Sequence, residues 1–202
     1  MQRAVKPLLF LVCLLPLASL VWAAVNYQLG PDPGEKLMLE IGAWAARLLI
    51  ATLLVSPLRT WSGWVSLLRL RRMLGLFCFF YASVHLSLFA HFYLGWVAER
   101  LLEEIVERPY ISAGFTAWLI MLPLALTSNR AMQRRLRRNW QRLHRGVYAA
   151  AVLVSLHILW QVRSDFGEAL VYALIFALLL AWRLMRYRKK QSSASNAKLL
   201  DA

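Results

Sequence analysis

The chain has 202 residues, of which 60% are hydrophobic, and its mean hydropathy is +0.51. Soluble domains are about 45–50% apolar, so this composition excludes an ordinary soluble domain and indicates a membrane protein. The net charge of +14 could also suit a nucleic-acid-binding protein. Because the basic runs lie between long apolar stretches, a membrane with anionic lipids explains them better, and we expect no nucleic-acid partner.

Six apolar stretches approach the length of about 20 residues that a membrane-spanning helix needs. They cover roughly residues 7–25, 37–57, 74–97, 111–127, 146–163 and 167–184. The sequence therefore predicts an all-α integral membrane bundle of six helices. We expect one transmembrane domain over residues 1–190 and a short cytoplasmic tail over residues 191–202.

The segments that flank these stretches alternate in charge. One set holds 19 Lys or Arg residues and a single acid, and comprises the N-terminus, 58–73, 128–145 and the residues after Ala181. The other set holds 4 basic and 9 acidic residues, and comprises 26–40, 98–110 and 163–168. Since basic loops stay on the cytoplasmic side, both termini are predicted to be cytoplasmic.

The second stretch carries one charged residue, Arg47, near its midpoint. An arginine at this depth needs a polar partner inside the bundle. It can contact a carboxylate of a bound cofactor, such as a haem propionate. It can equally pair with Glu40, which lies seven residues earlier on the same helix face. The sequence leaves both interpretations open.

Two histidines are expected at equal depth in the membrane. His85 lies about 11 residues, or roughly 17 Å, from the cytoplasmic end of the third stretch, and His157 about 12 residues, or roughly 18 Å, from that of the fifth. Imidazoles at equal depth on two helices can ligate one haem iron from both faces. The alternative is a structural hydrogen bond between helices.

The other two histidines do not match in depth. His144 lies at the cytoplasmic end of the fifth stretch, whereas His91 lies about 26 Å deep in the third. They therefore cannot ligate one iron. His144, which we expect to precede the helix proper, is either a ligand at an inner, second site or a contact to the loop or lipid headgroups. His91 is better explained as a structural or outer-face residue.

A nicotinamide-binding motif of the G-x-G-x-x-G type does not occur in the sequence. The electron donor is therefore expected to be a lipid-soluble quinol or another protein. Acid–base pairs, activated nucleophiles and zinc-ligand spacings are not recognised either. The chemistry would be that of the cofactor, so we expect electron transfer rather than conversion of a substrate by the chain.

Four segments resemble the MsrQ family (formerly YedZ), within the ferric reductase-like transmembrane superfamily. They are RRMLGLFCFFYASVHL, ERPYISAGFTAW, LALTSNRAMQRRLRRNWQRLHRGVY and LHILWQV. The resemblance implies a six-helix protein of the bacterial inner membrane that binds b-type haem (one or two) and FMN. The family's haem histidines fall at His85, His144 and His157, whereas His91 matches none.

The resemblance also implies an electron path. Electrons come from the quinone pool or a cytosolic flavin reductase. They pass to MsrP, a periplasmic molybdopterin enzyme that repairs methionine sulfoxide in oxidised proteins. The partner is expected to dock on the outer segments 26–36 and 98–110, through acidic residues such as Glu103, Glu104 and Glu107.

Two rival functions remain open from the sequence. The first is a stand-alone quinol-linked or ferric-reducing cytochrome b without a dedicated partner. The second is a haem-free transporter or structural membrane protein, in which the histidines relay protons or pack.

Overall fold

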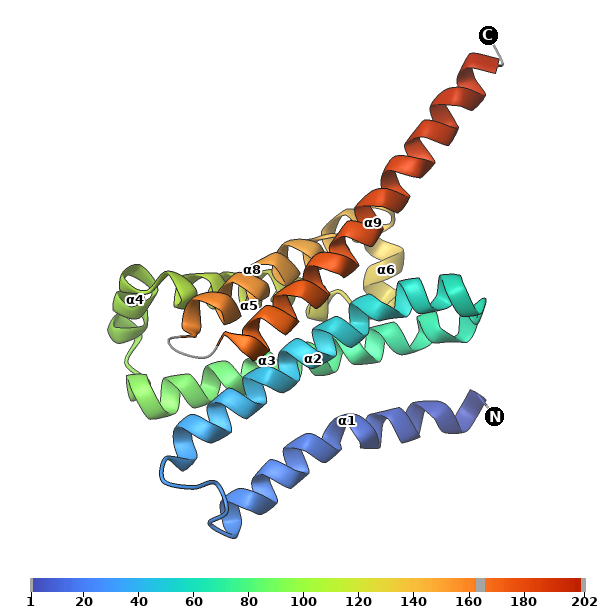
Figure 1. Cartoon of the computed structure of the whole chain (residues 1–202). Helices are drawn as coiled ribbons and strands as arrows, with labels where there is room; N and C mark the ends of the chain where they lie inside the picture. Colours follow the sequence, from blue (N-terminus) through green and yellow to red (C-terminus); the bar gives the residue numbers. More distant parts are fainter. Residues whose placement is uncertain (1, 163–165, 201–202) are drawn as a thin grey trace.

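The computed structural model describes residues 2–162 and 166–200, and the regular elements in these ranges are all helices (Figure 1). The long helices are α1 (Gln2–Val25), α2 (Pro33–Ser62), α3 (Leu68–Phe89), α5 (Pro109–Leu126), α8 (Gly146–Gln161) and α9 (Gly167–Leu200). The shorter ones are η1 (Val65–Leu67), the π-helical turn η2 (Ala90–Leu94), α4 (Ala98–Glu107), α6 (Arg130–Leu136) and α7 (Arg138–His144). Within the described residues, six segments are long and apolar enough to cross a membrane, which confirms the predicted all-α, multi-pass architecture.

Two antiparallel helix pairs make up the centre of the bundle. The first pair is α2 with α3 and the second is α5 with α8, while α9 packs against α8 and α2 (Figure 1). The largest fully buried side chains of the bundle come from three helices. They are Ile41, Leu49, Leu53 and Pro57 of α2, Tyr81 of α3 and Phe176 of α9.

The termini of several helices carry local signals that explain where they begin and end. Pro33 stands at the start of α2, where its missing N–H costs nothing, and the Asp32 carboxylate accepts a hydrogen bond from the Glu35 N–H at 2.9 Å. At the other end, Gly63 adopts φ 71°, a conformation that glycine allows. Asn129 caps α6 by accepting from the Met132 N–H at 2.7 Å.

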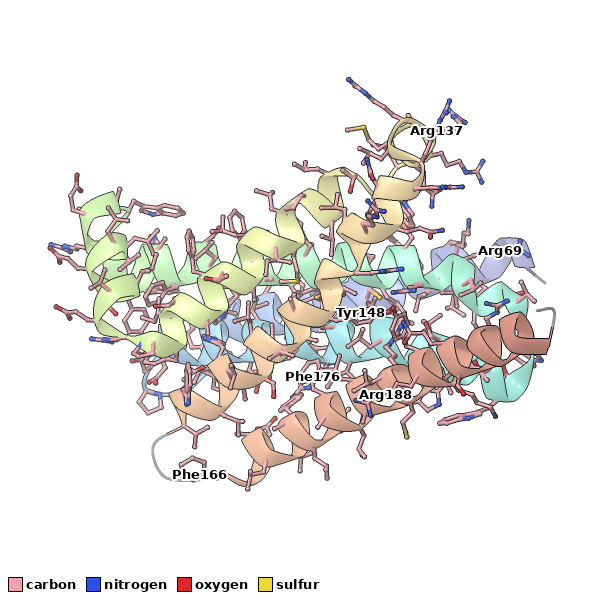
Figure 2. All side chains as sticks on the ribbon, turned by 90° about the horizontal axis from the view of Figure 1, so that it is seen from above. Arg69, Arg137, Tyr148, Phe166, Phe176 and Arg188 are labelled. Carbon is pink, nitrogen blue, oxygen red and sulfur yellow. The ribbon has the colours of Figure 1, made fainter. Side chains whose placement is uncertain are left out.

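The basic loops lie together at one end of the bundle. Figure 2 shows Arg69 and Arg137 at this end and Phe166 at the opposite end. The charge alternation in the sequence therefore corresponds to a real polarity of the fold. Which end faces the cytoplasm stays a prediction.

Helix boundaries differ from expectation mainly at the end of the chain. Helix α9 continues to Leu200, so residues 191–200, expected as a tail, extend the last helix. Residues 163–165 and 201–202, which include part of an expected outer segment and Asp201, lie outside the described residues. Elsewhere, the acidic segment 98–110 contains the helix α4, and His144 ends α7 just before α8 begins, as expected.

Candidate functional site

His85 of α3 and His157 of α8 face each other between the two central helix pairs. Their ring centres are 6.2 Å apart and their planes are inclined by 80°. Both side chains are partly buried. The predicted pairing of these two residues is thus seen directly. Their role as ligands stays a prediction.

Each of the two rings is anchored through the same nitrogen atom. The His85 Nδ1 lies 2.9 Å from the Met38 carbonyl oxygen, and the His157 Nδ1 lies 2.7 Å from that of Tyr110. A carbonyl oxygen can only accept, so we assign the proton of each neutral ring to Nδ1. Nε2 then keeps its lone pair on both rings and is free to bind a metal ion.

The distance between the rings fits one metal ion held between them. Imidazole–metal bonds are about 2.0–2.1 Å long and a nitrogen lies about 1.1 Å from its ring centre, so two opposed ligands have centres about 6.2–6.4 Å apart. The observed separation is 6.2 Å. Two imidazoles leave the remaining coordination positions to a prosthetic group, and a porphyrin supplies four nitrogens in one plane. The residues present therefore fit a haem.

The sequence did not single out the residues that hold these rings. They are the acceptors Met38 and Tyr110 and two glycines, Gly42 and Gly114, against which the imidazoles pack. A backbone carbonyl leaves no trace in side-chain chemistry, so Met38 and Tyr110 gave no signal. The glycines did carry one, since each lies in a helix where glycine is unfavourable.

His144 lies away from this pair and is bound by its own neighbours. Its Nε2 is 3.1 Å from the Thr127 hydroxyl, and its ring stacks on Trp140 with 4.0 Å between centres. Trp140 in turn donates from Nε1 to the Thr127 carbonyl at 2.9 Å. The loop contact that the sequence left open is therefore present, while ligation by His144 stays a prediction.

Arg47 is surrounded by side chains of the protein itself. Its Nε donates to the Tyr172 hydroxyl at 2.9 Å, and its terminal nitrogens lie 3.6 Å from Glu168 and 4.0 Å from Glu40. The guanidinium also lies over the Trp44 ring at 4.9 Å. The pairing with Glu40 that the sequence proposed is present but long. A contact with a cofactor carboxylate stays a prediction.

His91 is an exposed residue of η2. Its Nδ1 accepts from Trp96 Nε1 at 3.3 Å, a contact five residues along the chain. This local arrangement agrees with the structural interpretation that the sequence favoured.

Comparison with known proteins places the chain in a family. The family described as ferric reductase like transmembrane component matches residues 41–155. A curated relative from Xanthomonas campestris pv. campestris (strain 8004) is 46% identical over 189 residues, which cover 91% of this chain and 87% of the relative. The chain belongs to the MsrQ family. A second relative, from Polaromonas naphthalenivorans (strain CJ2), is 43% identical over 94% of this chain and 88% of its own length.

Both MsrQ relatives carry the name protein-methionine-sulfoxide reductase heme-binding subunit. The ferric reductase match includes His85 and His144 and ends two residues before His157. No solved structure shows a significant match to the chain.

Proposed function

We propose that the chain is a b-type haem electron carrier of the bacterial inner membrane. The observation that carries the proposal is the His85–His157 pair, whose 6.2 Å separation suits one iron between two imidazoles. The name of the MsrQ relatives, a heme-binding subunit, supports it. Haem supplies one-electron redox chemistry when bound. The chain supplies two nitrogen ligands, their orientation through Met38 and Tyr110, and an apolar surrounding.

His144 is proposed as a ligand at an inner site near the basic end of the bundle. The family resemblance supports this role, and so does the free Nδ1 that remains when Nε2 is bound to Thr127. Among the described residues, the ring of His144 stacks on Trp140 and no second histidine ring contacts it. A second haem there would therefore take its other axial ligand from a different kind of group.

FMN enters the proposal as a second cofactor through the family resemblance alone. Its negatively charged phosphate could bind to the positively charged segments 58–73 and 128–145. These segments would face the cytoplasm. In this orientation the basic end receives electrons from a quinol or a cytosolic flavin reductase, and the acidic end delivers them to a periplasmic molybdopterin reductase of the MsrP type.

The acidic end offers a surface for this periplasmic partner. An open cleft of about 620 Å³ is lined there by four acids, Asp32, Glu35, Glu40 and Glu168, and by two basic residues, Lys36 and Arg47. In α4, Glu99, Glu103 and Glu107 are exposed. Glu104 pairs with Arg108 at 3.1 Å, so Glu103 and Glu107 are the expected docking residues whose charge is free of this pairing. Such a surface would steer a basic patch.

Reconstitution tests the function as a whole. Purified chain in liposomes, supplied with a quinol, should reduce methionine sulfoxide only when the molybdopterin reductase is added. Glu103→Lys with Glu107→Lys should slow this partner reduction severalfold without changing reduction of the chain by quinol, because the opposite charge repels a basic partner. Arg100→Gln, on the same helix, is the matched control and should have little effect.

The same reconstitution separates the rival functions. If the chain reduced ferric chelates without any partner, as fast as it supports methionine sulfoxide reduction with the partner, a stand-alone reductase would be favoured. An unchanged rate in the Glu103→Lys, Glu107→Lys variant would contradict the proposed docking surface. A purified chain without a haem absorption band would contradict the proposed function itself.

A further inference from the structure

The two ligand histidines are held by the same arrangement, built twice. In the α2–α3 pair, the Met38 carbonyl binds the His85 Nδ1 at 2.9 Å, and in the α5–α8 pair the Tyr110 carbonyl binds the His157 Nδ1 at 2.7 Å. In both pairs the acceptor precedes its histidine by 47 residues. A glycine follows each acceptor by four residues, Gly42 after Met38 and Gly114 after Tyr110.

The position of these glycines has a geometric reason. In an α-helix the side chain at one position covers the turn on its N-terminal side. A side chain at position 42 or 114 would therefore cover the carbonyl four residues before it. That carbonyl already accepts the N–H of the glycine, and the absence of a side chain leaves its second lone pair open to an imidazole from the neighbouring helix.

The space at both glycines is too small for a methyl group. A Cβ at Gly42 would lie 2.8 Å from the His85 Nδ1 and 2.9 Å from its Cε1. At Gly114 the corresponding distances to His157 are 2.7 Å and 3.0 Å. The ring could avoid such a group only by moving away from its carbonyl acceptor, which would break the hydrogen bond.

The helical glycines Gly34, Gly75 and Gly146 contact no histidine. At Gly75, also in α3, a Cβ would meet only the Thr52 Cγ2 at an ordinary 3.7 Å. Gly42 and Gly114 are thus distinguished by the group they contact, and Gly75 offers a matched control.

We propose that Gly42 and Gly114 are positioning residues for the two axial imidazoles, an inference that rests on the proposed haem function. Because they have no side chain, they leave the carbonyl oxygens of Met38 and Tyr110 accessible to the Nδ1–H groups of the two histidines. These hydrogen bonds fix the tautomer, hold Nε2 toward the iron and make each imidazole a stronger electron donor. Because both imidazoles would donate more strongly, the ferric state is favoured and the midpoint potential is lowered.

The test uses the full chain in lipid nanodiscs with Gly42→Ala, Gly114→Ala and the control Gly75→Ala. Electron paramagnetic resonance of the ferric form and a redox titration are recorded for each. We expect a shifted low-spin signal and a raised midpoint potential in Gly42→Ala and in Gly114→Ala, and wild-type values in Gly75→Ala. Wild-type values in all three variants would overturn the inference and leave the haem function standing.

A measurement on the wild type covers the case in which an alanine variant fails to fold. Proton NMR of the ferric protein should show two hyperfine-shifted imidazole N–H signals that persist in D₂O, one for each protected Nδ1–H. Rapid loss of either signal in D₂O would contradict the inference. A wild type with no haem would instead overturn the proposed function, and the inference with it.

Discussion

At the residue scale, the hydroxyl of Thr127 decides which nitrogen of His144 is free. This hydroxyl donates its proton to the Pro123 carbonyl at 2.6 Å, so its oxygen accepts from the His144 Nε2 at 3.1 Å. The proton of the neutral ring is then on Nε2, and Nδ1 carries the lone pair. His144 would therefore bind a metal through the opposite nitrogen from His85 and His157.

His144→Ala should leave the His85–His157 centre intact. The two positions on this stretch of chain are 13 residues apart, or about 20 Å along a helix. We expect an unchanged low-spin signal in electron paramagnetic resonance. Any decrease in the haem-to-protein ratio then gives the amount of haem bound at the inner site. Pyridine haemochrome quantification gives the ratio. Loss of the low-spin signal in His144→Ala would show that the two sites are not separate.

The sequence predicted the pairing of His85 and His157 because their depth depends only on helix rise and on where each apolar stretch begins. It could not predict the contacts of Arg47 with Tyr172 and Glu168, because these residues lie more than 120 positions away in the chain. It also could not show that Thr127 and Trp140 bind His144. Contacts of this kind depend on how helices are placed, which composition and periodicity do not determine.

At the element scale, the Tyr81 hydroxyl takes the place of a missing backbone hydrogen bond in α1. Pro16 disturbs the helix in this turn, and the Tyr81 hydroxyl lies between two groups that bind each other only in an undisturbed α-helix. It accepts from the Leu17 N–H at 3.1 Å and donates to the Cys13 carbonyl at 2.8 Å. This residue of α3 therefore attaches α1 to the bundle.

Tyr81→Phe should weaken this attachment. The side chain is fully buried, and the variant leaves an N–H and a carbonyl without a partner, at a cost of about 1–3 kcal/mol. Thermal unfolding in detergent should show a lower midpoint for Tyr81→Phe than for Tyr187→Phe, which alters an exposed tyrosine. Equal midpoints would contradict the assigned role. The sequence could place α1 in the membrane but could not identify its anchor, 64 residues away.

At the scale of the whole molecule, the separation of charge predicts the orientation in the membrane. Loops rich in Lys and Arg lie together at one end (Figure 2), and such loops remain cytoplasmic. The two native cysteines, Cys13 and Cys78, are buried, so a new exposed cysteine can be labelled with little background.

Glu103→Cys should react with a membrane-impermeant maleimide added to spheroplasts, whereas Gln133→Cys should react only after the membrane is permeabilised. Both positions are exposed, so accessibility across the membrane is the only difference being measured. The reverse pattern would place the termini outside the cytoplasm and invert the proposed direction of electron flow.

The most direct test of the central claim is the absorption spectrum of the purified chain, oxidised and reduced, for the wild type and for His85→Ala, His157→Ala and His91→Ala. We predict a Soret band and a reduced α-band in the wild type and in His91→Ala. Loss or strong change of these bands is expected in His85→Ala and in His157→Ala. Wild-type bands in either of the latter two variants would contradict ligation of one haem by this pair.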